Sequence, residues 1–241
     1  MKQELKKDKI IIIDFGSQVT KLIARRIREY KVFSEILTPK DLKKKYIFTN
    51  VKGIILSGGP STVTENKHPN IPNEIFNLNI PILGICYGLQ LIAKHYKAKV
   101  KSNISKREFG RTLLLKSRDS LLTKGFFIKN KCKVWMSHQD TVHKLPEGFT
   151  KIASTNESKM TIIENKKKRI YGIQFHPEVT HTENGNIIFK NFIFNICKAK
   201  KNWKLDFEKK KIIKEIKNIV RKDKVICALS GGVDSSVAAL L

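Results

Sequence analysis

The sequence predicts an α/β protein in which a largely parallel sheet is covered by crossover helices. Short β-branched runs alternate with amphipathic stretches through about the first two hundred residues, the pattern of strand, helix, strand units. The segment 9–14 (KIIIID) is apolar almost throughout, as a buried strand is, and 19–30 then places apolar residues at helical spacing. The content of 41% hydrophobic and 29% charged residues is typical of a globular protein with its own core.

The remaining elements of this domain are expected in chain order. Further strands are expected at 32–37, 53–59 and 80–85, followed by a helix at 89–97. Shorter strands are then expected at 109–115, 132–137 and 151–156, with a hairpin at 160–175 whose turn is rich in lysine. Residues 186–198 have the pattern of a closing helix that packs on the sheet. These elements form one domain, 9–198, preceded by a tail at 1–8.

A second unit is expected after a linker at 199–204. Residues 205–222 form an amphipathic helical pattern, and VICAL (225–229) is predicted to be a strand. A glycine-rich loop, SGGVDSS (230–236), and the beginning of another helix follow. The segment 205–241 therefore has the first elements of a second α/β domain, which we expect to be truncated.

Charge and composition exclude several classes of function. The net charge of +27 is compatible with nucleic-acid binding, but 40 of the 48 basic residues are lysines spread along the chain, whereas proteins that read base sequence rely on arginine. Nucleic acid is therefore an improbable partner. No apolar run is long enough to span a membrane and no signal peptide is evident, so a cytoplasmic protein without a membrane partner is expected. The four cysteines form no CxxC pair, so no metal site is expected.

The most informative stretch is ILGICYGLQL (82–91). It places Gly84-x-Cys86-x-Gly88 between an expected strand and an expected helix, which is the cysteine form of a nucleophile elbow. The helix N-terminus favours the thiolate form of Cys86, and the thiolate is the nucleophilic form. A lone cysteine is more often a small buried apolar residue, so the prediction of a nucleophile depends on partners elsewhere in the chain.

Such partners are present. His176 and Glu178, in IYGIQFHPEVT (170–180), alternate along an extended segment and can hydrogen-bond, with the carboxylate orienting the imidazole. LSGGPSTV (56–63) brings a strand into a glycine pair, and the amides of Gly59 and Tyr87 are the expected donors to an oxyanion. The sequence therefore predicts acyl transfer through Cys86, His176 and Glu178.

SGGP, GICYGLQ and QFHPE, in this order, resemble class I glutamine amidotransferases over residues 9–198. The resemblance implies a three-layer, flavodoxin-like open sheet and hydrolysis of glutamine. Cys86 would attack the carboxamide, His176 would pass the proton to the departing ammonia, and Glu178 would orient His176. The same resemblance places Gln90 along the glutamine pocket.

Three further stretches, DFGSQ (14–18), REFG (107–110) and VWMSHQDTV (134–142), are similar to the glutaminase domain of the GMP synthetase family. There the last loop holds the amino-acid end of glutamine, mainly through backbone groups, which implies this role for Ser137 and His138. Gln139 departs from the family pattern, which has glycine at this position. The consequence of this difference for the loop backbone is left open.

The loop SGGVDSS lacks the lysine and spacing of a Walker loop and resembles the pyrophosphate loop of N-type ATP pyrophosphatases. The resemblance assigns ATP binding to Ser230, Gly231, Gly232, Val233, Asp234, Ser235 and Ser236. A complete enzyme of this kind would use ATP and Mg²⁺ to aminate XMP to GMP, whereas the glutaminase domain itself needs no cofactor. We expect the chain to be an N-terminal fragment that cannot make GMP alone, with homodimerisation only through a further C-terminal domain.

Two alternatives remain at this stage. The chain is either a free-standing amidotransferase subunit that serves another synthetase, or a basic nucleic-acid-binding protein on an inactive amidotransferase fold. The intact Cys86, His176 and Glu178 argue against the second alternative.

Overall fold

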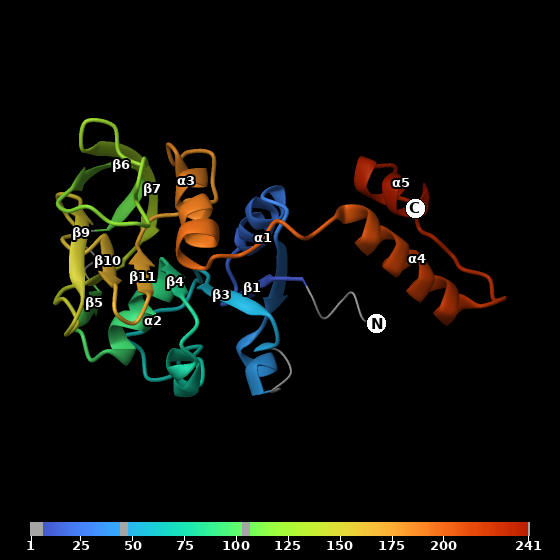
Figure 1. Cartoon of the computed structure of the whole chain (residues 1–241), viewed down its shortest axis with the longest axis horizontal. Coiled ribbons are helices and arrows are strands. Elements are labelled where there is room, and N and C mark those ends of the chain that lie inside the picture. The colour runs from blue at the N-terminus through green and yellow to red at the C-terminus, as the bar shows by residue number, and fades with distance from the viewer. Residues whose placement is uncertain (1–6, 44–47, 103–106, 241) are drawn as a thin grey trace. The chain divides into compact units, whose positions relative to one another are not determined.

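The computed structural model describes residues 7–43, 48–102 and 107–240, and it divides the chain into two compact units, Met1–Asn202 and Trp203–Leu241 (Figure 1). The predicted tail at 1–8 lies mostly outside the described residues. Its last residue, Asp8, is buried, and its carboxylate accepts a hydrogen bond from the amide of Lys200 at 2.9 Å. Residues just before the end of the first unit are thus tied to its first strand.

The first unit is built on a nine-stranded sheet with the order β2-β1-β3-β4-β11-β10-β9-β6-β7. The strands β2, β1, β3, β4 and β11 are parallel, and the others pair antiparallel. The strands are β1 Lys9–Ile13, β2 Phe33–Leu37, β3 Val51–Leu56, β4 Ile82–Ile85, β6 Glu108–Lys116, β7 Lys131–His138, β9 Thr150–Ser154, β10 Ile162–Asn165 and β11 Ile170–Ile173. A separate antiparallel pair is formed by β5, Val100–Ser102, and β8, Asp140–Val142.

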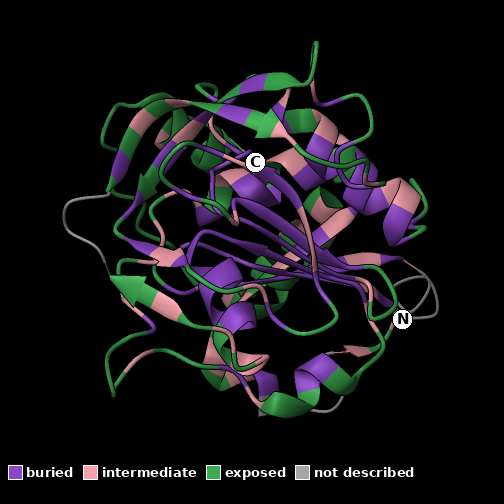
Figure 2. Cartoon of the chain, turned by 90° about the vertical axis from the view of Figure 1, so that its left-hand side faces the viewer, coloured by how far each residue is buried: buried purple, intermediate pink, exposed green. Residues whose placement is uncertain are grey.

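Helices cover both faces of this sheet, which makes three layers. On one face lie α1, Thr20–Glu29, and α3, Gly185–Lys190, which continues as a π-helical turn, Asn191–Ile196. The other face is covered by α2, Tyr87–His95, and the short 3-10 helix Asn73–Asn77. A further 3-10 helix spans Pro39–Lys43. Figure 2 shows buried strands between partly exposed helices. The two hydrophobic cores lie on opposite faces of the sheet because successive strand side chains point to opposite faces.

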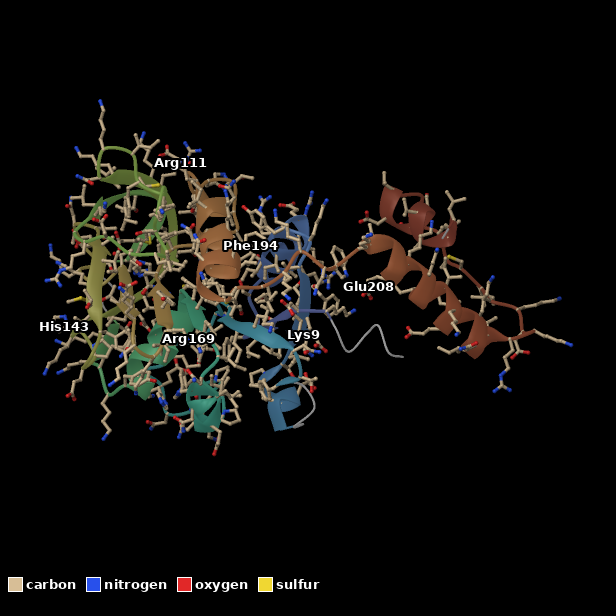
Figure 3. The ribbon with its side chains drawn as sticks, in the orientation of Figure 1. Lys9, Arg111, His143, Arg169, Phe194 and Glu208 are labelled. Atoms are coloured by element: carbon tan, nitrogen blue, oxygen red, sulfur yellow. The ribbon has the colours of Figure 1, made fainter. Side chains whose placement is uncertain are left out.

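Burial explains the sequence patterns. In β1, Ile10 to Ile13 are fully buried because both faces of the strand are covered, as expected for a central parallel strand. In β6, by contrast, Phe109, Leu113 and Leu115 are exposed and alternate with more buried positions. The outside of the unit is strongly basic, and Figure 3 shows Arg111 reaching outward from β6. Among the described residues, no helix is long and apolar enough to cross a membrane.

The predicted elements of the first unit are found, with shifted ends. The closing helix is divided between α3 and the π-helical turn, and the β5–β8 pair and both 3-10 helices were not predicted.

The second unit contains α4, Leu205–Val220, and α5, Val233–Leu240. The predicted strand at 225–229 is wrong: this segment has no regular structure and its apolar side chains are exposed, 96% in the case of Ile226. A strand needs a neighbour with which to form hydrogen bonds, and no described residue pairs with this segment. Local β propensity alone does not form a strand.

Candidate active site

Cys86 lies at the turn between β4 and α2, with φ 52° and ψ −105°. This conformation is costly for a residue with a side chain, so the surroundings must hold it. The amide of Cys86 donates to the carbonyl of Ile173 at 2.8 Å, and that of Gly88 donates to the carbonyl of Ser57 at 3.1 Å. A Cβ on Gly84 would lie 2.5 Å from the carbonyl oxygen of Gly88. The two glycines therefore allow the tight turn that projects Cys86.

His176 and Glu178 follow β11 and form a buried pair. Nδ1 of His176 is 2.8 Å from Oε1 of Glu178, and the Glu178 side chain is fully buried. Burial lowers the pKa of His176, but hydrogen bonds to Cys86 and Glu178 and the negative charges of both outweigh it and raise the pKa from 6.5 to about 10. The imidazole is therefore positively charged at neutral pH, next to the cysteine and its carboxylate.

Gly58 makes room for the meeting of Cys86 and His176. A Cβ at position 58 would lie 3.0 Å from Cε1 of His176 and 3.7 Å from the Cβ of Cys86. Both side chains thus pack over the bare backbone of Gly58, and a side chain at this position would push them apart.

Backbone contacts that the sequence did not reveal hold the His176 segment. The hydroxyl of Thr182 donates to the carbonyl of His176 at 2.6 Å and accepts from the amide of Trp135 at 3.0 Å. The amide of His176 donates to the carbonyl of Trp135 at 3.1 Å. On the other side, Nε of Arg26 in α1 donates to the carbonyl of Glu178 at 3.3 Å.

A cavity of about 500 Å³ opens beside Cys86. Its walls include every residue predicted for the oxyanion and for glutamine binding: Gly59, Tyr87, Gln90, Ser137 and His138. Within the part of the chain that the structure describes, the amides of Gly59 and Tyr87 donate to no protein acceptor. Both amides are thus available to an oxygen bound next to the cysteine.

The glutamine-binding prediction omitted Asp140, which also lines this cavity. Its carboxylate accepts a short hydrogen bond from the hydroxyl of Thr62, and its carbonyl accepts from Nε2 of Gln90 at 3.0 Å. Asp140 is 5% exposed. Gln139, which precedes it, has φ outside the left-handed region, so the absence of glycine there introduces no backbone strain.

A second buried acid–base pair supports the loop after β7. Nε2 of His138 is 3.2 Å from Oε2 of Glu108, and both side chains are at least 95% buried. The hydroxyl of Thr155 donates to the other oxygen of Glu108 at 2.7 Å. Because Glu108 and His138 are register partners in β6 and β7, they fix the strand end from which Ser137 enters the cavity.

The predicted ATP-binding residues lie in the second unit, where they lead into α5. The hydroxyls of Ser235 and Ser236 donate to the carbonyl of Gly232 at 2.9 and 3.0 Å, and Gly231 has φ +79°. The loop is exposed, and its hydroxyls bond within the loop itself. Among the described residues, no group of three or more His, Cys, Asp or Glu side chains could hold a metal ion.

Comparisons with known proteins agree with this geometry. The family described as glutamine amidotransferase class-I matches residues 11–196. Proteins named GMP synthase [glutamine-hydrolyzing] are 50% identical in Treponema denticola, over 97% of this chain and 44% of the relative, and 46% identical in Clostridium botulinum, over 98% and 46%. The chain thus spans less than half the length of these curated relatives.

Solved structures show the same fold. A Thermoplasma acidophilum protein described as one of the subunits of a GMP synthase has a TM-score of 0.67 and 30% identity, over 86% of this chain and 98% of that one. A glutamine amidotransferase from Thermotoga maritima has a TM-score of 0.61 at 24% identity, over 85% and 86%. The order of the three motifs, the large central sheet and the match over most of the chain lead to one assignment: the chain belongs to the class I glutamine amidotransferase family.

Proposed function

We propose that the chain hydrolyses the side-chain amide of glutamine to glutamate and ammonia. The observation that carries this proposal is the contact of Cys86, at a strained strand-to-helix turn, with an imidazole that Glu178 orients and charges. A cysteine activated by a charged histidine is a nucleophile suited to acyl transfer.

The residues divide the reaction into two steps. The thiolate of Cys86 attacks the carboxamide carbon, and the amides of Gly59 and Tyr87 stabilise the negative oxygen that develops. His176 gives its proton to the departing ammonia, which leaves a thioester on Cys86. Water then attacks the thioester while His176 accepts a proton from it, and glutamate leaves as the thiolate is restored.

The cavity walls suit the amino-acid end of glutamine. The carboxylate of Asp140 complements the α-ammonium group, and its buried position strengthens this attraction. Gln90 holds the backbone of Asp140, and Ser137 and His138 supply further backbone groups on the same wall. We propose that these four residues select glutamine.

We further propose that the ammonia is used by a GMP synthase. The support is the identity of about 50% to proteins of that name over nearly the whole chain. In such an enzyme, ATP and Mg²⁺ would activate XMP, and Ser230 to Ser236 would form part of the ATP site, since loop amides and a helix N-terminus suit phosphate. The glutaminase site itself would need no cofactor. Homodimer formation would depend on protein outside this chain.

One observation favours a second possibility, a glutaminase that works as a separate chain. The Thermoplasma acidophilum protein described as one of the subunits of a GMP synthase is matched over 98% of its length, so a glutaminase of about this extent is found as a chain of its own. Addition of a separate ATP pyrophosphatase chain to the protein would then produce GMP from XMP. With the fragment alternative, this mixture would produce none.

Glutamate release tests the proposed activity. Purified chain and the Cys86→Ala variant are compared at saturating glutamine, and release is expected from the parent only. The parent rate is expected to be low, because glutaminases of this family depend on their synthetase partner. Equal release from the two proteins would remove Cys86 from the mechanism.

A further inference from the structure

Gln174 is a buried amide that the reaction described above does not use. It follows directly after β11, and its side chain is completely buried. Nε2 of Gln174 lies 3.7 Å from Sγ of Cys86, within the hydrogen-bond range for sulfur. Its Oε1 is also buried and has no hydrogen-bond partner among the described residues.

An unpaired buried amide oxygen destabilises the fold. An apolar side chain of similar size would avoid this cost, so the amide at position 174 needs a reason other than packing. The one hydrogen bond of its side chain goes to the reacting sulfur. The opposite orientation of the amide would place oxygen against the sulfur and would repel a thiolate, so the donor faces Cys86.

The sulfur has two hydrogen-bonding neighbours with opposite preferences. The carbonyl of Ser137, 3.7 Å away, can only accept, so it favours the protonated thiol. The amide of Gln174 donates, so it favours the thiolate. A donor bond to the charged form lowers the free energy of that form.

We propose that Gln174 stabilises the thiolate of Cys86 by donating a hydrogen bond from Nε2, in competition with the carbonyl of Ser137. This inference rests on the proposed role of Cys86 as the nucleophile. Gln174 is then a second donor to the sulfur besides His176, and it comes from the same segment, two residues earlier.

Other charged groups near the sulfur belong to other elements and stay unchanged in the test. His176 contacts the cysteine, and Glu178 acts through His176. Glu65, His138 and Asp140 line the cavity on its other walls. A change in the titration of Cys86 on substitution of Gln174 alone is therefore caused by the amide.

The test measures the rate of iodoacetamide alkylation of Cys86 between about pH 5 and pH 10, a range that brackets an ordinary thiol. The Cys227→Ser background removes the exposed cysteine, and Cys132 and Cys197 are buried. Gln174→Met removes the donor and keeps an unbranched side chain. Gln174→Glu keeps the shape and replaces the donor with an acceptor. Gln18→Met, at an exposed position before α1, is the matched control.

We expect the midpoint of the rate profile to rise by about one pH unit in Gln174→Met and further in Gln174→Glu. The rate below the midpoint would then fall about tenfold or more. Gln18→Met should match the parent. A folded Gln174→Met or Gln174→Glu protein, judged by its melting curve, with the parent's midpoint would overturn the proposal.

A second measurement needs no substitution of Gln174. The side-chain ¹⁵N–¹H₂ resonances of Gln174 should shift with pH at the midpoint of Cys86 alkylation in the parent and stay constant in Cys86→Ala. Resonances that do not respond in the parent would contradict the hydrogen bond. Neither measurement involves glutamine, so the inference can fail while glutamine hydrolysis stands, and the reverse.

Discussion

At the scale of residues, the site depends on one buried carboxylate that keeps one imidazole charged. Glu178 contacts His176 at 2.8 Å, and its other oxygen has no partner among the described residues. Its charge therefore acts almost entirely on His176. Removal of that charge without loss of shape should separate orientation from electrostatics.

Glu178→Gln keeps the side-chain size but removes the negative charge. Loss of that charge lowers the pKa of His176, so less imidazolium is available to protonate the leaving ammonia. We expect kcat for glutamate release to fall by about 10²-fold or more, since the comparable change in a serine protease triad costs about 10⁴-fold. The pH-rate profile of the variant should lose activity at a lower pH than that of the parent. An unchanged kcat would exclude an electrostatic role of Glu178.

The raised pKa of His176 also predicts how stability depends on pH. The folded-state pKa is about 10 and the ordinary pKa of histidine is 6.5, so the folded protein binds the proton more tightly than the unfolded chain does. This contribution is complete below about pH 6.5 and is lost as the pH rises toward 10. Between these values the free energy of unfolding should fall by up to about 1.4 kcal/mol per pH unit from this group.

Urea denaturation of the parent and of His176→Gln across this range checks that prediction. The variant lacks the titrating group, so its stability should fall less steeply with pH than that of the parent. Parallel curves for the two proteins would show that His176 does not carry the raised pKa.

The sequence could predict the residues whose chemistry is rare and whose spacing is fixed by short motifs. Cys86 lies between two glycines, and His176 and Glu178 are two positions apart. Asp140, Gln174 and Arg26 could not be predicted in the same way, because each is a common residue whose contact depends on the fold. Arg26 meets the carbonyl of Glu178 across 152 positions in the chain, and no local pattern records such a contact.

At the scale of elements, the close approach of β4 and α2 produces the turn at Cys86. Gly84→Ala would place a methyl group 2.5 Å from the carbonyl oxygen of Gly88. Because both partners are backbone in buried elements, neither can move away easily. We expect a loss of more than about 3 kcal/mol in the free energy of unfolding, or failure to fold.

Gly125→Ala is the matched control for this substitution. Gly125 has φ +77° but nothing within 4 Å of an added Cβ, so only the conformational cost of about 1 kcal/mol applies. Chemical denaturation of both variants should give a clearly larger loss for position 84. Equal losses would show that crowding at the elbow is not what requires glycine there.

Elements supported by their own periodicity were predictable, whereas elements that depend on a neighbour were not. The buried run of β1 and the amphipathic α1 carry their own signals. The segment 225–229 carries a strand signal too, but it has no described strand to pair with and stays irregular. The short β5–β8 pair is the opposite case, since three residues from each side pair only because the fold brings them together.

At the scale of the whole molecule, the first unit closes its cores with its own residues. Both clusters of buried side chains consist of residues up to Ala199, and Asn202 still contacts the amide of Asp8 at 3.2 Å. In the second unit, by contrast, Ile212, Ile216 and Ile219 of α4 are more than half exposed.

A chain that ends after Asn202 should therefore fold as the first unit does. We expect its melting temperature to stay within about 2 °C of that of the parent, a change well below that caused by the loss of 1 kcal/mol. Calorimetry of both proteins measures this directly. A lower melting temperature for the shortened chain would mean that 203–241 stabilises the first unit.

The central claim is that Cys86 forms a covalent bond to the carbon that bears the amide of glutamine. A glutamine analogue with a chloroketone in place of the carboxamide tests this claim, because peptide mapping by mass spectrometry locates the adduct. We predict one adduct, on Cys86, prevented by excess glutamine and formed much more slowly in His176→Ala. An adduct confined to the exposed Cys227, or labelling of Cys86 that glutamine does not prevent, would contradict the account.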